Sequence, residues 1–228
     1  MRNLIQSVNR DVVIKNTTKM SEEKHEIVEG IKYTYAAEWT RSLESRDHWL
    51  LYHYQQQLME NKVKPGDKVL EIGPGSGFCS NYLKSNGVQV TTLDIDEDKE
   101  ADIHANIVTY QFEKSYDHVL AFEVFEHIPY EKFIQVLEKL HDRCRNIFMS
   151  VPENKRRLLD LDLWLPIIKN VRISVYVPKV TITETHHFWE VGHKNFTERR
   201  LETNIQDSGF EIEEKSKYKG RIYFILSS

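Results

Sequence analysis

A glycine loop between an apolar strand and the start of a helix constrains the fold of this chain more than any other feature. Lys68–Ile72 reads KVLEI, a short buried strand, and is followed by GPGSG at 73–77. A helix is predicted over Phe78–Asn86, and Gly87 suits the position that ends it. Glycines let a backbone turn sharply and approach a ligand that a Cβ would exclude, while the helix start presents free N–H groups. We therefore expect a ligand-binding turn here.

Beyond this loop, apolar strands alternate with helices. Strands are predicted at Lys68–Ile72, Val88–Leu93, Ala101–Ala105, Tyr116–Phe122 and Asn146–Val151. A helix over Tyr130–Cys144 carries Phe133, Val136, Leu137 and Leu140 at helical spacing. The alternation predicts βαβ crossovers, and hence an α/β fold with a mainly parallel sheet and helices on both faces.

The C-terminal pattern predicts one more helix and a closing hairpin. Thr197 is a suitable N-cap, and Gly209 would end the helix. Strands at Phe210–Glu214 and Ile222–Leu226 flank the polar turn Lys217–Gly220. Two strands so close in sequence predict a C-terminal antiparallel hairpin.

Two segments lie outside this alternation. We expect residues 1–61 to form an N-terminal helical cap on a core domain of residues 62–228, because Ser21–Asn61 looks helical. Its aromatic residues, among them Tyr33 and Trp39, would contact the ligand or pack against the sheet. Residues 153–195 exceed the usual 2–6-residue α/β loop and are rich in apolar residues, so we expect a substrate lid there.

The apolar part of that insertion, Leu158–Val180, has three open interpretations. It could line a substrate pocket, touch a lipid-linked acceptor, or form the interface of a homodimer.

Composition excludes several classes of protein. Cys79 and Cys144 are the only cysteines, without a CxxC pair, so a disulfide scaffold and a zinc ribbon are excluded. No apolar run reaches the roughly 18–20 residues of a membrane helix, and we expect no integral membrane segment. The N-terminus lacks the apolar region of a secretion signal, so a cytoplasmic location is expected. A net charge of −4 argues against a general nucleic-acid partner.

An acidic residue at the end of the second strand limits the class of ligand that the loop can bind. Asp94 lies 21 residues after Gly73, where a carboxylate can accept hydrogen bonds from both ribose hydroxyls of an adenosine ligand. The dinucleotide fingerprint G-x-G-x-x-G would need a glycine at 78, but this chain has Phe78 and its third glycine is Gly77. An NAD-dependent oxidoreductase is therefore disfavoured.

The ordered motifs VLEIGPGSG, TTLDID and YDHVLAFEVFEHIP resemble class I S-adenosylmethionine-dependent methyltransferases, from about Lys68 to Phe210. The resemblance implies a Rossmann-like seven-stranded sheet whose last hairpin supplies one antiparallel strand. It also implies S-adenosyl-L-methionine (SAM) as cofactor. The residues that it assigns to cofactor binding are Glu71, Gly73, Gly75, Gly77, Asp94, Ile95, Asn106 and Glu123.

The resemblance assigns these residues to successive parts of the cofactor: its methionine part, its ribose and its adenine. The glycines lie against its methionine part, which Glu123 flanks. Asp94 holds the ribose, and Ile95 packs on the adenine. Asn106 stands where the family usually has an acidic residue near the adenine amino group, and its side-chain oxygen can still accept that hydrogen bond.

Glu123, Glu126 and His127, in EVFEH, follow the fourth strand and would face one direction if this turn is helical. Two carboxylates and an imidazole suit Mg²⁺, Mn²⁺ or Zn²⁺. The pattern E-x-x-E-H resembles the ubiquinone-biosynthesis O-methyltransferases and the small-RNA 2′-O-methyltransferases, which take a further histidine from downstream. Of His186 and His187, the resemblance favours His187 because of its spacing from the FWE stretch.

The candidate metal ligands are thus Glu123, Glu126, His127 and His187, and the candidate catalytic residues are Glu126, His127 and His187. The same motif also occurs in family members without a metal, where these residues shape the wall of the site. His127 could then serve as a general base, since histidine titrates near neutral pH.

The predicted function is methyl transfer from SAM to a small-molecule acceptor, at a hydroxyl oxygen, on a sugar or a lipid-linked compound. Two alternatives stay open: a non-catalytic SAM-binding regulatory protein and a 2′-O-methyltransferase of RNA. The net charge of −4 weighs against a polyanionic RNA acceptor.

Overall fold

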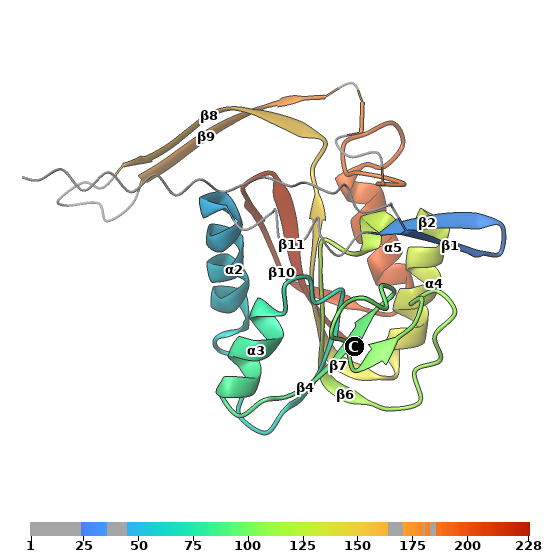
Figure 1. Ribbon diagram of the computed structural model, residues 1–228. Coiled ribbons are helices and arrows are strands. Elements are labelled where there is room, and N and C mark those ends of the chain that lie inside the picture. The colour runs from blue at the N-terminus through green and yellow to red at the C-terminus, as the bar shows by residue number, and fades with distance from the viewer. Residues whose placement is uncertain (1–23, 36–44, 164–170, 180, 183–185) are drawn as a thin grey trace, which may run out of the picture.

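The computed structural model describes residues 24–35, 45–163, 171–179, 181–182 and 186–228. Its centre is a seven-stranded sheet (Figure 1). The strands are β3 (Lys68–Ile72), β4 (Gln89–Asp94), β5 (Ile103–His104), β6 (Tyr116–Phe122), β7 (Cys144–Pro152), β10 (Glu211–Tyr218) and β11 (Arg221–Ser227). Their order across the sheet is β10-β11-β7-β6-β3-β4-β5.

Parallel pairing joins β5, β4, β3, β6 and β7, and β11 runs antiparallel to both of its neighbours, β7 and β10. The predicted α/β fold, with a mainly parallel sheet and a C-terminal antiparallel hairpin, is confirmed. Because the parallel strands end on the same edge, the loops after β3, β4 and β6 meet there, as ligand sites in such sheets require.

Helices cover both faces of the sheet. α2 (Arg46–Met59) and α3 (Phe78–Ser85) lie on one face, and α4 (Tyr130–His141) and α5 (Glu198–Asp207) lie on the other (Figure 1). Successive strand residues point to opposite faces, so Val69 joins the core under α3 while Leu70 joins the core under α4. This double burial explains the almost continuous apolar strands.

The predicted helix ends agree with the structure within a few residues. The side chain of Thr197 caps α5 by accepting a hydrogen bond from the N–H of Arg200 at 3.1 Å. α4 ends at His141, before the predicted end at Cys144, because Cys144 already belongs to β7. None of the helices in the described part of the chain combines the length and the apolar character that crossing a bilayer requires.

The N-terminal region differs from the prediction. The helical interpretation of Ser21–Asn61 is wrong over residues 24–35, which form the antiparallel hairpin of β1 (Lys24–Val28) and β2 (Ile31–Tyr35). Glu29 and Gly30 join the strands with φ of 51° and 78°, the left-handed pair that a two-residue hairpin turn needs.

Helix is confirmed over Arg46–Met59. The side chain of Tyr33 is buried in the main core, whereas Trp39 lies outside the described residues.

The long insertion forms a ribbon. β8 (Lys155–Leu163) and β9 (Val171–Pro178) pair only with each other among the described strands, and they project past α2 at the edge where β7 ends (Figure 1). After the ribbon the chain returns to the body, where Trp189 is fully buried.

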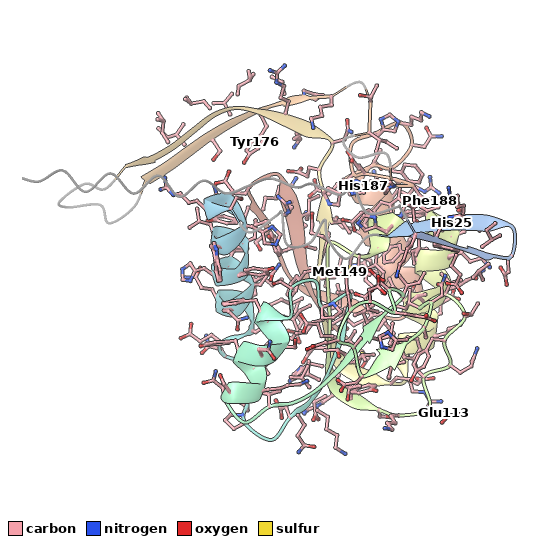
Figure 2. All side chains as sticks on the ribbon, in the orientation of Figure 1. His25, Glu113, Met149, Tyr176, His187 and Phe188 are labelled. Carbon is pink, nitrogen blue, oxygen red and sulfur yellow. The ribbon has the colours of Figure 1, made fainter. Side chains whose placement is uncertain are left out.

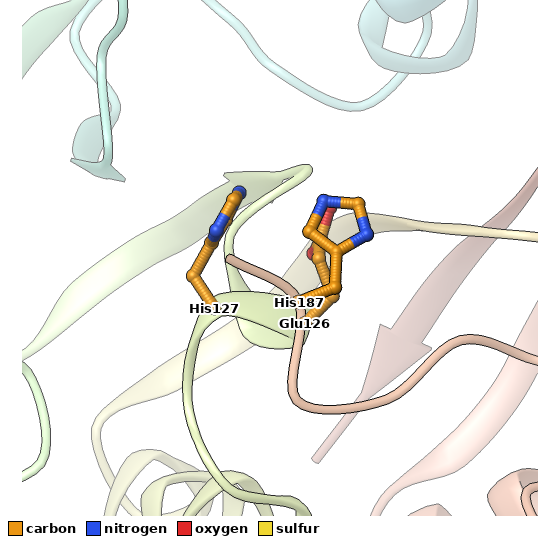
Figure 3. Close-up of side chains that lie close together, drawn as sticks. All are labelled: Glu126, His127 and His187. Carbon is orange, nitrogen blue, oxygen red and sulfur yellow. The ribbon is translucent and has the colours of Figure 1, made fainter. Parts of the chain in front are cut away.

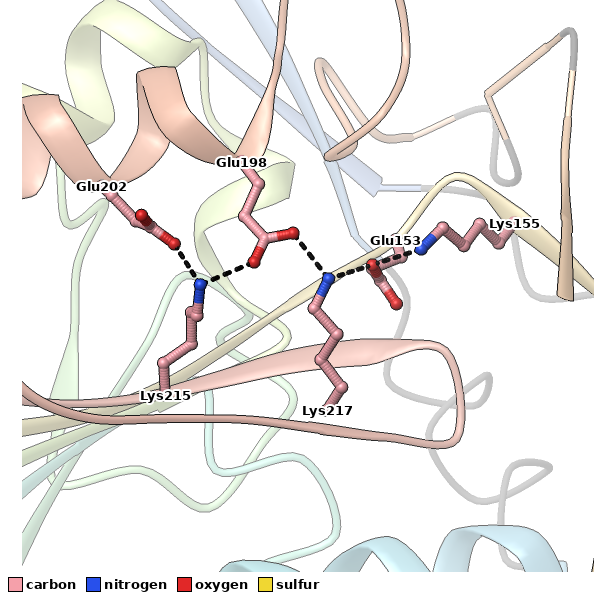
Figure 4. A network of polar contacts seen from close by, with 6 residues as sticks. All are labelled: Glu153, Lys155, Glu198, Glu202, Lys215 and Lys217. Carbon is pink, nitrogen blue, oxygen red and sulfur yellow. Dashed lines mark hydrogen bonds and ion pairs between the residues drawn. The ribbon is translucent and has the colours of Figure 1, made fainter. Parts of the chain in front are cut away.

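Ion pairs fix the start of the ribbon to the hairpin of the sheet (Figure 4). Lys217 of β10 contacts Glu153, which also contacts Lys155 at the start of β8. Lys217 and Lys215 both contact Glu198 of α5. The network therefore joins β8 to the consecutive elements α5 and β10.

Candidate functional site

The glycine loop turns as the sequence predicts. Gly73, Gly75 and Gly77 have φ of 64°, 59° and 75°, values that L-residues with a side chain rarely adopt. Gly73 is also close-packed, because a Cβ there would lie 2.8 Å from Cγ2 of Val124. The loop is thereby held against the turn that follows β6.

Glu71 lies beneath this loop, on β3. Its side chain is buried against Ser80 and Cys79 at the start of α3, and burial raises its pKa to about 7. Its Oε2 has no hydrogen-bond partner among the described residues. Glu71 therefore offers a buried acceptor next to the glycines.

Asp94 ends β4 with its carboxylate buried. Oδ1 accepts the N–H of Asp96 at 2.9 Å, and Oδ2 contacts Nζ of Lys99 at 2.9 Å. The following residue, Ile95, packs on the edge of the main core. A ribose bound to Asp94 would therefore share or replace the contact with Lys99.

The β1–β2 hairpin reaches Asn106, which is buried. Oδ1 of Asn106 accepts the N–H of Val108 at 3.0 Å, and its Nδ2 donates to Glu26 at 3.2 Å. Its oxygen retains one lone pair for the predicted adenine contact. Lys24 and Lys132 form ion pairs with Asp98 and Glu29, so charged contacts hold the hairpin at both ends.

Glu123 turns the chain out of the sheet after β6, with φ of 56°. Oε1 accepts the hydroxyl of Ser150 at 2.8 Å, and Oε2 accepts Nε–H of Arg221 at 2.8 Å. The structure thus directs this carboxylate toward β7 and β11, and Glu123 does not join the group formed by Glu126 and the histidines.

Glu126, His127 and His187 converge (Figure 3). Glu126 and His127 lie in the short 3₁₀ helix η1 (Phe125–His127). One ligand atom from each of the three residues lies within 4.8 Å of the others, and the two imidazole centroids are 4.9 Å apart. The partner from the HH pair is His187.

Backbone and indole hydrogen bonds bring His187 to η1 across sixty residues of sequence. The N–H of Phe188 donates to the carbonyl of Glu126 at 2.8 Å, and Nε1–H of Trp189 donates to the carbonyl of Ile128 at 3.1 Å. Phe188 also lies 6.2 Å from the ring of Tyr33, beside the hairpin (Figure 2).

Sequence reasoning missed the residue that orients His187. Nδ1 of His187 lies 2.7 Å from Oε1 of Glu190, whose Oε2 accepts Nδ2–H of Asn154 at 2.6 Å. A carboxylate accepts only, so this contact places the proton on Nδ1 and leaves Nε2 as an acceptor. The signal was present in HFWE, as a glutamate three residues after the histidine.

Burial also sets the protonation states of this group. Both oxygens of Glu126 are buried without a hydrogen-bond partner among the described residues. Burial, and next the charge of Glu123, raise the pKa of Glu126 well above its usual range. Burial, and next the electrostatic influence of the neighbouring His187, lower the pKa of His127 to about 4. At neutral pH, His127 is therefore a neutral ligand or base.

The comparisons with known proteins agree with this geometry. A family model described as a methyltransferase domain matches residues 46–215, about three quarters of the chain. The chain therefore belongs to this methyltransferase family, and its sheet is that of the class I S-adenosylmethionine-dependent methyltransferases. No curated protein matches the sequence.

Solved structures share the fold at low identity. A S-adenosylmethionine-dependent methyltransferase from Clostridium acetobutylicum is 10% identical, with a TM-score of 0.52 over 82% of this chain and 93% of that one. The 1,6-didemethyltoxoflavin-N1-methyltransferase of Burkholderia thailandensis, with bound S-adenosylhomocysteine, is 14% identical, with a TM-score of 0.50 over 91% of this chain and 96% of that one. Magnesium protoporphyrin IX methyltransferase from Synechocystis is 15% identical, with a TM-score of 0.54 over 79% and 83%.

The protonation state of Glu126 leads to a prediction for the protein kept free of metal ions by EDTA. The folded chain holds a proton on Glu126 that the unfolded chain releases near pH 4.3. The free energy of unfolding therefore falls as pH rises above this value, by up to about 1.4 kcal/mol per pH unit. Glu126→Gln, which cannot ionise, should match the wild type at pH 4 and be more stable at pH 7 and above. Urea unfolding at several pH values measures this.

The exposed Glu138→Gln on α4 is the matched control and should show no such gain. Equal pH profiles for Glu126→Gln and the wild type would contradict an uncompensated carboxyl at this position.

Proposed function

We propose that the chain binds SAM along the glycine loop and Asp94, and transfers its methyl group to a hydroxyl oxygen of a small-molecule acceptor. The observation that carries this proposal is the orientation of His187 by Glu190, beside His127 and Glu126. A hydroxyl must lose a proton to become methylated, and this group offers an acceptor for it.

The residues present fit the cofactor. Three glycines with positive φ leave room at the loop, and Asp94 is a buried carboxylate at the end of β4. Glu71 and Asn106 retain acceptor capacity on either side. SAM would supply the methyl group from its sulfonium and leave as S-adenosylhomocysteine.

His187 would take the hydroxyl proton on Nε2. The carboxylate of Glu190 holds the ring in one tautomer and stabilises the positive charge that the ring gains. His127, neutral at pH 7, lines the same space and would orient the acceptor hydroxyl. Holding the two reactants in line supplies much of the remaining acceleration, because it removes the entropy cost of their encounter.

A divalent cation also fits the group. Both oxygens of Glu126 are buried without a partner among the described residues, and two imidazoles stand beside them. Glu126, His127 and His187 would hold the ion, with Glu190 as the outer partner that fixes the ring of His187. Nε2 of His187 would then be a ligand of the ion, in place of its role as the proton acceptor. When bound, a cation would lower the pKa of an acceptor hydroxyl.

Cofactor binding is tested by thermal shift. SAM and S-adenosylhomocysteine should each raise the melting temperature, since a ligand that binds only the folded state stabilises it, and NAD should not. Asp94→Asn should lose most of the shift, because the amide cannot accept at both oxygens.

Asp98→Asn, a nearby exposed position that pairs with Lys24, is the control and should keep the shift. Stabilisation by NAD alone would overturn the assignment of the cofactor.

The proposed roles of the histidine and its partner are tested by turnover in an acceptor screen. His187→Gln and Glu190→Gln should lower kcat by roughly 10²–10⁴-fold for the histidine, and by less for the glutamate, while S-adenosylhomocysteine still binds. His186→Gln, the adjacent histidine, is the matched control. If His186→Gln lowers kcat as much as His187→Gln does, the assignment of this role to His187 is wrong.

Binding of SAM together with inactivity of the wild type toward every acceptor class would instead favour a non-catalytic SAM-binding protein. Turnover on an RNA with a free 2′-hydroxyl would favour the RNA alternative.

The proposed cation is tested by titrating EDTA-treated protein with Mn²⁺ and Zn²⁺. The melting temperature of the wild type should rise on addition of one of these ions, and that of Glu126→Gln should not, since an amide is a weaker ligand than a carboxylate. Glu138→Gln should behave as the wild type. No shift in the wild type would exclude these ions and would favour the role of His187 as the proton acceptor.

A further inference from the structure

The β8–β9 ribbon exposes aliphatic side chains on one face. Leu159 pairs with Val175 and Leu161 pairs with Ile173, so these four residues share a face. They are 41–44% exposed, and Leu158, at the bulge, is 60% exposed. Isolated two-stranded ribbons are marginally stable in water, and contiguous exposed apolar surface marks an interaction site.

This face is turned away from the body of the protein. Tyr176 packs on the body, with its Cε1 3.7 Å from the position that a Cβ on Gly220 would occupy. Its label lies between the ribbon and α2 in Figure 2. Because successive strand residues point to opposite faces, Val175 points outward where Tyr176 points inward.

One basic residue shares the aliphatic face, and the ribbon as a whole has more basic than acidic residues. Arg156 is exposed and pairs with Val177, which by alternation shares the face of Val175. The two strands and the residue after them contain five basic and two acidic residues: Lys155, Arg156, Arg157, Arg172 and Lys179, against Asp160 and Asp162. The ribbon is therefore positive in a chain whose net charge is −4.

We propose that the β8–β9 ribbon docks on an anionic lipid bilayer surface, with Leu159, Leu161, Ile173 and Val175 entering the headgroup region. A ribbon that combines an apolar face with an excess of basic residues is typical of elements that lie in this interface, where acidic headgroups attract the basic residues.

The size of the face favours a bilayer over a second copy of the chain. Strands of nine and eight residues are roughly 30 Å long at 3.3 Å per residue, and two strands are about 10 Å wide. One face therefore covers about 300 Å², against the roughly 800 Å² per partner of a standard protein interface.

The proposal goes beyond methyl transfer and does not depend on it. The ribbon is nevertheless connected to the candidate site. Asn154, just before β8, donates to Glu190, and its carbonyl accepts the N–H of Lys179, which follows β9. A docked ribbon would hold the chain segment that carries His187 on the side of the protein that faces the membrane.

Vesicle co-sedimentation of the full chain tests the proposal. The wild type should bind phosphatidylcholine vesicles containing roughly a third phosphatidylglycerol, more weakly as salt rises to about 0.5 M, and should not bind phosphatidylcholine alone. The double variants Leu161→Thr/Ile173→Thr and Leu159→Thr/Val175→Thr should each lower the partition coefficient about tenfold or more, because less apolar surface enters the bilayer. Threonine keeps the β-strand preference.

Ile27→Thr, which removes a 65% exposed aliphatic side chain from the β1–β2 hairpin, is the matched control and should bind as the wild type does. Far-UV circular dichroism and the melting temperature show whether each variant folds, and the salt and lipid dependence of the wild type tests the proposal without any variant. Absence of vesicle binding, or equal binding by all variants, would overturn it. So would a wild-type dimer that the double variants dissociate, if no vesicle binding accompanies it.

Discussion

Trp189 fixes the chain segment on which the candidate site depends. Its ring is fully buried between Tyr130 and Phe133 of α4, at centroid distances of 5.0 and 5.3 Å, and its Nε1–H donates to the carbonyl of Ile128. The ring of Trp189 thus buries its apolar surface against α4, and its only polar atom has a hydrogen-bond partner. As a result, the residues on either side of it, His187 and Glu190, are held at η1.

The same anchored segment connects the site to the ribbon. Glu190 contacts His187 through one oxygen and Asn154 through the other, and Asn154 stands at the base of β8. The ring of His187, the carboxylate of Glu190 and the base of the ribbon thus belong to one hydrogen-bonded chain. Removal of the Asn154 side chain would leave Oε2 of Glu190 without this donor.

Prediction from the sequence succeeded where local pattern and tertiary packing agree. The strands and helices from Lys68 onward follow short apolar runs, capping residues and glycine turns, and the structure has them at the expected places. It failed for the β1–β2 hairpin, because helix was inferred from a loosely apolar segment and the two-residue Glu29–Gly30 turn was overlooked. Glu190 was missed although it lies three residues after His187, because only the buried contact shows that the two side chains meet.

The sequence by itself determined the α/β class, the glycine turn and the acid at the end of β4, because these depend on residues that are close in the chain. Tertiary structure alone decided which of the candidate residues meet. It separated Glu123, held by Ser150 and Arg221, from Glu126, and it brought His187 to His127. The physical reason is that such convergence depends on long-range packing and on competition among buried hydrogen-bond partners, neither of which spacing along the chain records.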